Sequence, residues 1–154
     1  GLHILIRLDL EVDLLENDLA VEDIPIEWNS RYKELLGVSP LNDREGCLQD
    51  VHWSEGQFGY FPSYLLGHLI SAQLSESMAY WLVDQGVEGE DPLATCILSG
   101  EESILLKWLR EHVHNLGRQT NAEELVDVVT GRPLSPSAFL SYLETKVEQL
   151  RYAD

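Results

Sequence analysis

The spacing of apolar residues along this 154-residue chain predicts helices from one end to the other. Within residues 2–17, Leu2, Ile6, Leu10 and Leu14 recur at every fourth position, which places them on one face of an amphipathic helix. No segment shows the regular alternation of apolar and polar residues that marks a half-buried strand. We therefore expect an all-α protein that folds as a helical bundle.

Proline, glycine and capping residues set the boundaries of the other expected helices. A helix that begins near Asp23 should end at Gly37, which is typical of a left-handed cap. Thr120 and Glu123 stand three positions apart, as in a capping box, and predict a helix that begins at residue 121. The expected helices are 2–17, 23–36, a short one with a loop within 40–59, 62–85, 92–100, 101–116, 121–130, and 136 to about Tyr152.

The helix expected from Pro62 is apolar nearly all round in its first turns, which include Tyr64, Leu65 and Leu66. Such a pattern is typical of a helix buried in the middle of a bundle. His68 lies within this apolar stretch, where a hydrogen-bonded core histidine is more common than a metal ligand.

Length and charge narrow the possible functions. The chain suits one domain, so residues 1–154 are expected to form a single helical region. A net charge of −17 with only ten Lys and Arg residues argues against nucleic acid and against an anionic membrane surface as partners. Cys47 and Cys96 lack metal-binding or redox spacing and fit free thiols in a reducing cytosol.

The start of the chain also carries information. Residues 1–7 begin inside an apolar periodic segment, without an initiator methionine or a helix cap. Natural starts rarely have this form, so we interpret the sequence as a piece of a longer polypeptide.

A cluster of polar and aromatic residues occupies positions 46–64. It contains Gln49, Asp50, His52 and Trp53, followed by tyrosines at 60 and 64. Hydrogen-bonding groups beside rigid aromatic rings are what a site needs to hold a polar ligand in a partly dry cleft. The same residues also suit a turn that caps neighbouring helices and fills a core, and the cluster alone leaves both interpretations open.

Arg7 lies in an apolar stretch with Glu11 one helical turn ahead. A guanidinium in this position either forms an ion pair with Glu11 within the helix or presents its fork to a carboxylate ligand. Sequence alone favours the pair within the helix.

The histidines and cysteines give little indication of a metal site or of a nucleophilic enzyme. None of the five histidines is followed by Glu, so the H-E-x-x-H zinc motif is absent. We therefore expect no metal ligands in this chain. A different enzyme that uses Cys47 as nucleophile with His52 remains a further hypothesis, although a buried, inert thiol is the more common case.

Taken together, these segments resemble the C-terminal third of the carboxypeptidase Taq family of zinc metallocarboxypeptidases. The family motif G-x-x-Q-D-x-H-W stands complete from Gly46 to Trp53, and F-G-Y-F-P-x-Y follows from Phe58 to Tyr64. The motif I-R-x-x-A-D is matched in part, because Leu10 and Glu11 stand where the pattern has Ala and Asp.

The resemblance implies a large, mostly helical, zincin-like peptidase that removes single amino acids from peptide C-termini. Family members are usually cytoplasmic homodimers, and their zinc is held by H-E-x-x-H and a downstream Glu. Those ligands would lie upstream of this chain. The chain alone is therefore expected to be inactive and to bind no zinc, although the full-length enzyme needs the metal.

The order His, Tyr, Tyr is also similar to that in the related angiotensin-converting-enzyme-like peptidases. By that similarity His52 would hold the substrate backbone, Tyr60 and Arg7 would bind the terminal carboxylate, and Tyr64 would stabilise the tetrahedral intermediate. By the same similarity, three further side chains would orient His52 and shape the wall of the groove: Gln49, Asp50 and Trp53.

An alternative remains, in which the chain is a free-standing, non-catalytic helical module for interaction or regulation. In either case the apolar faces of helices 2–17 and 62–85 would lack cover from an upstream segment. We therefore expect the isolated chain to form dimers or larger assemblies.

Overall fold

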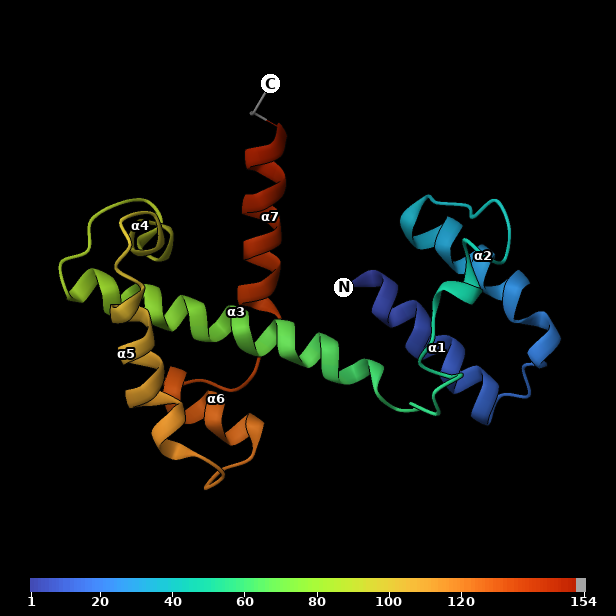
Figure 1. The fold of residues 1–154 in the computed structure, drawn as a ribbon, viewed down its shortest axis with the longest axis horizontal. Coiled ribbons are helices and arrows are strands. Elements are labelled where there is room, and N and C mark those ends of the chain that lie inside the picture. Colours follow the sequence, from blue (N-terminus) through green and yellow to red (C-terminus); the bar gives the residue numbers. More distant parts are fainter. Residues whose placement is uncertain (152–154) are drawn as a thin grey trace. The chain divides into compact units, whose positions relative to one another are not determined.

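The computed structural model describes residues 1–151, and these form helices and connecting loops without a strand (Figure 1). Tyr152, the expected end of the last helix, lies outside the described residues. The all-α fold is thus confirmed. The chain divides into two compact units, the first from Gly1 to Leu66 and the second from Gly67 onward.

The first unit is built around a pair of packed helices. Its elements are α1 (Leu2–Glu16), a 3₁₀ turn (Val21–Asp23), α2 (Ile24–Leu36), a second 3₁₀ turn (Cys47–Gln49) and the first turns of α3 (Phe61–Asp84). Ile6 and Leu10 of α1 are fully buried against Trp28 of α2, whereas Leu2 is 48% exposed, so the predicted fourfold face is buried in its middle but not at its start. Gly37 ends α2 in the left-handed conformation, at φ 67°, as the sequence predicts.

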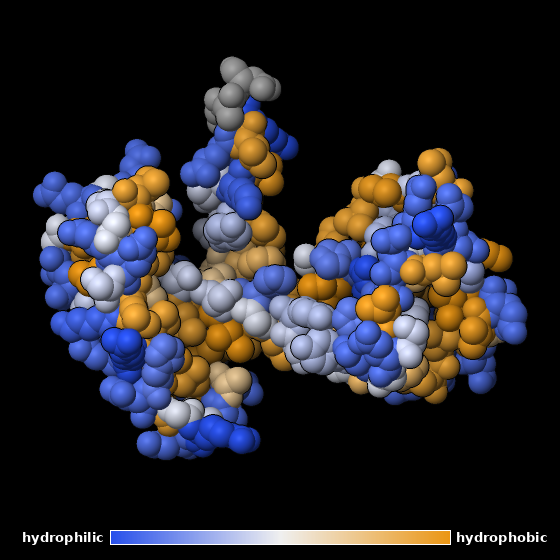
Figure 2. Space-filling model, in the orientation of Figure 1, coloured by the Kyte–Doolittle hydropathy of each residue, from blue (hydrophilic) through white to orange (hydrophobic). Residues whose placement is uncertain are grey.

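The second unit packs the rest of α3 against four shorter helices. These are α4 (Pro92–Leu98), α5 (Glu102–His112) with a 3₁₀ turn (His114–Leu116), α6 (Ala122–Thr130) and α7 (Ser137–Arg151). Its core contains Met78, Leu82, Cys96 and Trp108, all at most 6% exposed. Apolar side chains also lie on the surface of α7, where Leu140, Tyr142 and others are more than half exposed (Figure 2).

The capping box of α6 lies one residue later than the sequence analysis predicts. Asn121, not Thr120, is the cap: its side chain accepts from the backbone N–H of Glu124 at 2.9 Å, and the Glu124 carboxylate accepts from the backbone N–H of Asn121 at 3.2 Å. Both Thr and Asn are good caps. Thr120 with Glu123 and Asn121 with Glu124 both have the spacing of a capping box, and the structure uses the second pair.

The expectation that the first turns of α3 are buried is wrong. Tyr64 is 42% exposed and Leu66 45% exposed, whereas Phe61 is buried at 1%. One face of these turns packs inward through Phe61, and the opposite face is exposed.

One buried amide fixes the loop between α6 and α7. Gln73 of α3 is fully buried, and its Nε2 donates to Thr130 Oγ1 and to the carbonyl oxygens of Arg132 and Pro133 at 3.0–3.2 Å. Its Oε1 accepts from the backbone N–H of Ser135 at 3.0 Å. A buried donor or acceptor without a partner costs about 1–3 kcal/mol, so this network holds the loop firmly on α3.

Candidate functional site

Arg7 stands at the centre of a polar cluster in the first unit. Its Nε donates to the carboxylate of Asp50, and its Nη1 donates to the Tyr32 hydroxyl at 2.7 Å. Nη1 also bonds to the carbonyl oxygen of His3 at 2.8 Å and to its ring Nδ1 at 3.1 Å. The guanidinium lies over the ring of Trp28, with Cζ 4.9 Å from the centroid, a cation–π arrangement. Hydrogen bonds and stacking therefore fix its orientation.

The expected ion pair between Arg7 and Glu11 does not form. Glu11 is 3% exposed, and its Oε2 accepts the indole N–H of Trp53 at 2.9 Å while its Oε1 accepts the backbone N–H of Gly59. A pair one helical turn apart contributes only about 0.2–0.5 kcal/mol. Satisfying buried donors is worth more, so both charged side chains bond to the segment 50–59 instead of to each other.

Asp50 links Arg7 to the imidazole of His52. Its Oδ1 accepts from the backbone N–H of His52 at 2.9 Å and lies 2.8 Å from the ring Nδ1. A carboxylate only accepts, so Nδ1 carries a proton and donates it to Oδ1 of Asp50. Nε2 lies 3.0 Å from the hydroxyl of Tyr64. The result is a chain of bonds from Arg7 through Asp50 and His52 to Tyr64.

The surroundings of Asp50 favour its charged form. Burial alone raises the pKa of this carboxyl, but hydrogen bonds from the His52 backbone, from Arg7 and from the His52 ring, together with the positive charge of Arg7, bring the pKa below its ordinary value. Its side chain is 3% exposed. Asp50 is therefore an anion at neutral pH that orients both neighbours.

Two tyrosines lie beside this chain of bonds. The rings of Tyr60 and Tyr64 are perpendicular, with centroids 5.0 Å apart, and Tyr60 also stacks near His52 at 6.0 Å. Although Tyr60 precedes the first residue of α3, the two side chains are neighbours. They are 44% and 42% exposed, so both hydroxyl-bearing rings are accessible from solvent. The site can thus present neutral O–H donors next to an oriented imidazole.

The remaining motif residues support this arrangement to different degrees. Trp53 packs edge-on against Phe61, with centroids 6.2 Å apart. Gln49 is exposed and donates to the carbonyl oxygen of Arg44, so it does not contact His52 as the sequence analysis suggests. Gly46 is buried, and a Cβ there would lie 3.3 Å from Cβ of Pro40, which explains why the tight turn uses glycine.

Sequence analysis missed Tyr32, and it named Glu11 only as a partner of Arg7 and as a motif position, not as an anchor of the segment 50–59. Tyr32 hydrogen bonds to Arg7, and burial raises the pKa of its hydroxyl above the usual value although the nearby Arg7 opposes the rise. For Glu11, the one available signal was an acid on the apolar face of a helix. That signal suggests a buried partner, but the sequence does not say which one.

Cys47 shows no sign of an activated nucleophile. Burial, and the nearby negative charge of Asp43, raise the pKa of its thiol, whereas a reactive cysteine needs a lowered pKa. It packs against the core of the first unit. The raised pKa of its thiol and its packing against the core leave the hypothesis of a Cys47–His52 enzyme without structural support.

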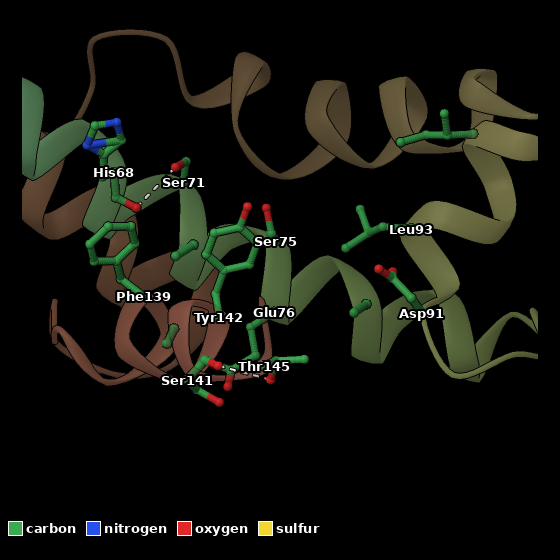
Figure 3. A pocket seen from close by; sticks show the side chains of 14 residues that line it. His68, Ser71, Ser75, Glu76, Asp91, Leu93, Phe139, Ser141, Tyr142 and Thr145 are labelled. Atoms are coloured by element: carbon green, nitrogen blue, oxygen red, sulfur yellow. Dashed lines mark hydrogen bonds between the residues drawn. The ribbon is translucent and has the colours of Figure 1, made fainter. Parts of the chain in front are cut away.

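A separate cavity of about 660 Å³ lies in the second unit, among α3, α7 and the segment 91–97 (Figure 3). Phe139 of α7 stacks on His68 at a centroid distance of 5.7 Å, so His68 is an exposed, stacked residue, not the core histidine expected from the sequence. Glu76 pairs with Arg132. None of the site residues predicted from the sequence lines this cavity.

Residues 1–151 contain no group of three or more His, Cys, Asp or Glu side chains placed to hold a metal ion. Among these same residues, no helix combines the length and apolarity needed to span a bilayer.

Comparisons with known proteins match the chain over nearly its whole length. The family model described as carboxypeptidase Taq (M32) metallopeptidase matches residues 1–147. Carboxypeptidase 1 of Bacillus subtilis is 38% identical, and thermostable carboxypeptidase 1 of Thermus thermophilus is 41% identical, each over 97% of this chain. The structure of metallocarboxypeptidase 1 of Trypanosoma cruzi matches with a TM-score of 0.82 at 37% identity, over 99% of this chain and 30% of that one. The chain spans only 28% of the length of the two curated relatives.

Proposed function

The chain belongs to the carboxypeptidase Taq (M32) metallopeptidase family, and we propose that it is the segment of a zinc-dependent carboxypeptidase that binds the substrate and stabilises the transition state. The reaction removes single amino acids from the C-termini of peptides. The observation that carries this proposal is the chain of bonds from Arg7 through Asp50 and His52 to the exposed Tyr64, whose ring lies against the exposed ring of Tyr60.

The proposed roles follow from what each group can donate or accept. Tyr60, with Nη2 of Arg7, engages the terminal carboxylate; Nη2 forms no hydrogen bond with any residue in 1–151. His52 holds the substrate backbone through Nε2 once the bond between Nε2 and the Tyr64 hydroxyl is broken. Tyr64, released from that bond, donates its O–H to the oxyanion of the tetrahedral intermediate, and such a donor contributes about 3–4 kcal/mol to catalysis. Asp50 supports His52, and Trp53 supports the loop. Gln49 is exposed, so we assign it only a minor role in the site.

The described residues do not provide a zinc site. Zinc enters the proposal only as the Lewis acid that the remaining part of the family fold would supply. Dimer formation and a cytoplasmic location, which the family resemblance implies, stay predictions. So does self-association of the isolated chain through exposed apolar residues such as Leu15, Leu66 and Leu150, each at least 45% exposed.

Peptide binding can be tested on the chain itself. A short peptide with a free C-terminal carboxylate is titrated into labelled chain, and the NMR signals of His52, Tyr60 and Tyr64 are followed. We expect a saturable shift with Kd on the order of 1 mM, equivalent to about −4 kcal/mol. The same peptide with an amidated C-terminus is the control and should bind at least tenfold more weakly. Equal binding of both peptides, or of neither, contradicts the proposed carboxylate site.

Catalysis needs the rest of the fold, so it is tested in a chimera. This chain replaces the matching 28% of the Bacillus subtilis carboxypeptidase, and release of C-terminal amino acids is measured with zinc. We expect Tyr64→Phe to lower kcat by about 10²–10³ with little change in KM, because the lost donor acts in the transition state. Tyr80→Phe, also exposed on α3 at 68%, is the matched control. An active chimera that tolerates Tyr64→Phe contradicts the role of Tyr64, and activity from the 154-residue chain alone contradicts the assignment of zinc to the missing part.

A further inference from the structure

Helix α1 attaches to the segment 50–59 at two points one helical turn apart. Arg7 holds Asp50 at the beginning of the segment, and Glu11 holds Trp53 within it and Gly59 at its end. Because one turn of helix spans about 5.4 Å, the rigid helix fixes the spacing between the two points. Asp50 leads to His52, and Gly59 leads directly to Tyr60.

The Glu11 carboxylate is suited to holding the segment 50–59 at two points. It is 3% exposed, and each of its oxygens accepts one N–H, from a side chain at residue 53 and from the backbone at residue 59. Hydrogen bonds to an ionised acceptor are about twice as strong as neutral ones. A neutral amide in its place could accept only one of the two bonds, since its NH₂ group would face the other donor.

We propose that Glu11 is a positioning residue that sets the placement of Tyr60 and Tyr64 relative to His52. It acts through the turn that ends at Gly59, where the backbone has φ 73°, and it touches none of the three rings itself. By closing this turn it determines where the chain enters α3. The direction in which Tyr60 and Tyr64 present their hydroxyls follows from that entry.

This inference rests on the proposed function for its catalytic meaning, but the positioning itself can be measured without substrate. Glu11→Gln keeps the shape of the side chain and removes its charge. Glu16→Gln makes the same change on an exposed residue of the same helix and is the matched control. In both variants, hydrogen exchange is measured at the Trp53 indole and the Gly59 amide. The ring signals of His52, Tyr60 and Tyr64, and the nuclear Overhauser contacts between His52 and Tyr64, report on the site.

We expect Glu11→Gln to speed exchange at the Trp53 indole and the Gly59 amide by at least tenfold. It should also shift the signals of all three rings and weaken the contact between His52 and Tyr64, while the Trp28 indole stays protected. Glu16→Gln should change none of these signals. The proposal is overturned if exchange at Trp53 and Gly59 accelerates while the rings keep their signals, because Glu11 would then be only structural.

A second variant keeps the test decisive if Glu11→Gln does not fold. Glu11→Asp keeps the charge but is one methylene shorter, so it cannot reach Trp53 and Gly59 together without moving one of them. We expect smaller ring shifts in the same residues, and unchanged ring signals in Glu11→Asp contradict the proposal.

The peptide titration then separates the two hypotheses. If the unmodified chain binds the carboxylate peptide, Glu11→Gln should weaken that binding by about tenfold, whereas Glu16→Gln should leave it unchanged. Ring shifts in Glu11→Gln, with no peptide binding by the unmodified chain, would support the positioning role and reject the proposed function. Normal peptide binding by a folded Glu11→Gln chain would reject the positioning role alone.

Discussion

Each of the two units uses buried polar side chains to fix a loop. These side chains are charged in the first unit and neutral in the second. In the second unit, the neutral amide of Gln73 holds residues 130–135 with four hydrogen bonds. In the first unit, the charged groups of Arg7, Glu11 and Asp50 hold residues 50–59. The loop held by charges leads into the exposed tyrosines, whereas the loop held by the amide connects two helices.

The difference shows what a charged anchor adds. An amide that satisfies all its neighbours gives a contact whose strength does not depend on pH. Ionised anchors give shorter, stronger bonds and a fixed tautomer for His52, but they must be compensated completely because an unpaired buried charge is destabilising. Complete compensation by partners distant in sequence is what orders the candidate site.

The largest expected effect comes from placing a charge on the neutral anchor. In Gln73→Glu a carboxylate oxygen would face the carbonyl oxygens of Arg132 and Pro133, so we expect the second unit to lose about 4 kcal/mol at pH 7. The pKa of the new carboxyl should be raised in the folded state. The loss should therefore be small below the unfolded value of about 4.3 and grow as pH rises above it.

Urea denaturation at pH 4 and pH 7 measures this loss, with indole NMR signals as local reporters. Trp28 and Trp53 report on the first unit, and Trp81 and Trp108 on the second. Gln85→Glu, at an exposed position just after α3, is the control and should have little effect. If Gln73→Glu proves as stable as the parent chain, the neutral anchor is not essential to its loop.

A smaller effect is expected from removing a charge in the first unit. Asp50→Asn leaves Arg7 without its counter-ion and weakens the bond to the His52 ring, so we expect a loss of about 2 kcal/mol at pH 7. The pKa of Asp50 is lowered in the folded state. Its contribution is therefore fully present above the unfolded value near 3.8 and is lost as pH falls through the lower, folded value.

The pH dependence of stability tests whether the Asp50 side chain acts through its charge. The Trp28 and Trp53 signals should show that Asp50→Asn and the parent chain differ in stability at pH 7, and that the difference narrows below pH 4. The Trp81 and Trp108 signals should show no such difference. A constant gap down to pH 2 would mean that the Asp50 side chain acts through shape instead of charge.

Local signals in the sequence predicted the helices well because they act within a few residues. Gly37 and Gly131 end α2 and α6 in the left-handed conformation, and Asp91 caps α4 by accepting from the N–H of Ala94 at 3.0 Å. The capping box was misplaced by one residue because Thr120 with Glu123 and Asn121 with Glu124 both fit the motif, so the local sequence does not decide between them.

The site was predictable in its members but not in its connections. The motif residues Asp50, His52, Tyr60 and Tyr64 do come together. The partners of Arg7 and Glu11 in the segment 50–59, however, lie 42 to 48 positions away along the chain. Periodicity along one helix identifies which side chains share a face, and so it suggested that these two residues pair with each other. It carries no information on which distant donors must be satisfied, and those donors decide the pairing.

The smallest expected effect concerns an ion pair at the surface of the first unit, which provides a baseline for the buried one. Arg31 bonds to Asp13, whose side chain is 30% exposed, and the hydrogen bonds from Arg31 and Asn17 lower the pKa of this carboxyl. Exposed pairs contribute about 0.2–1 kcal/mol and are screened by salt. Asp13→Asn should therefore cost about 0.5 kcal/mol in low salt and almost nothing in 1 M NaCl, measured by urea denaturation with the Trp28 signal. Asp50→Asn should keep most of its effect in 1 M NaCl, because its carboxylate is buried. If salt removes both effects equally, the charges at Asp50 and Asp13 contribute in the same way, and burial does not set the anchor of the site apart from an ordinary surface pair.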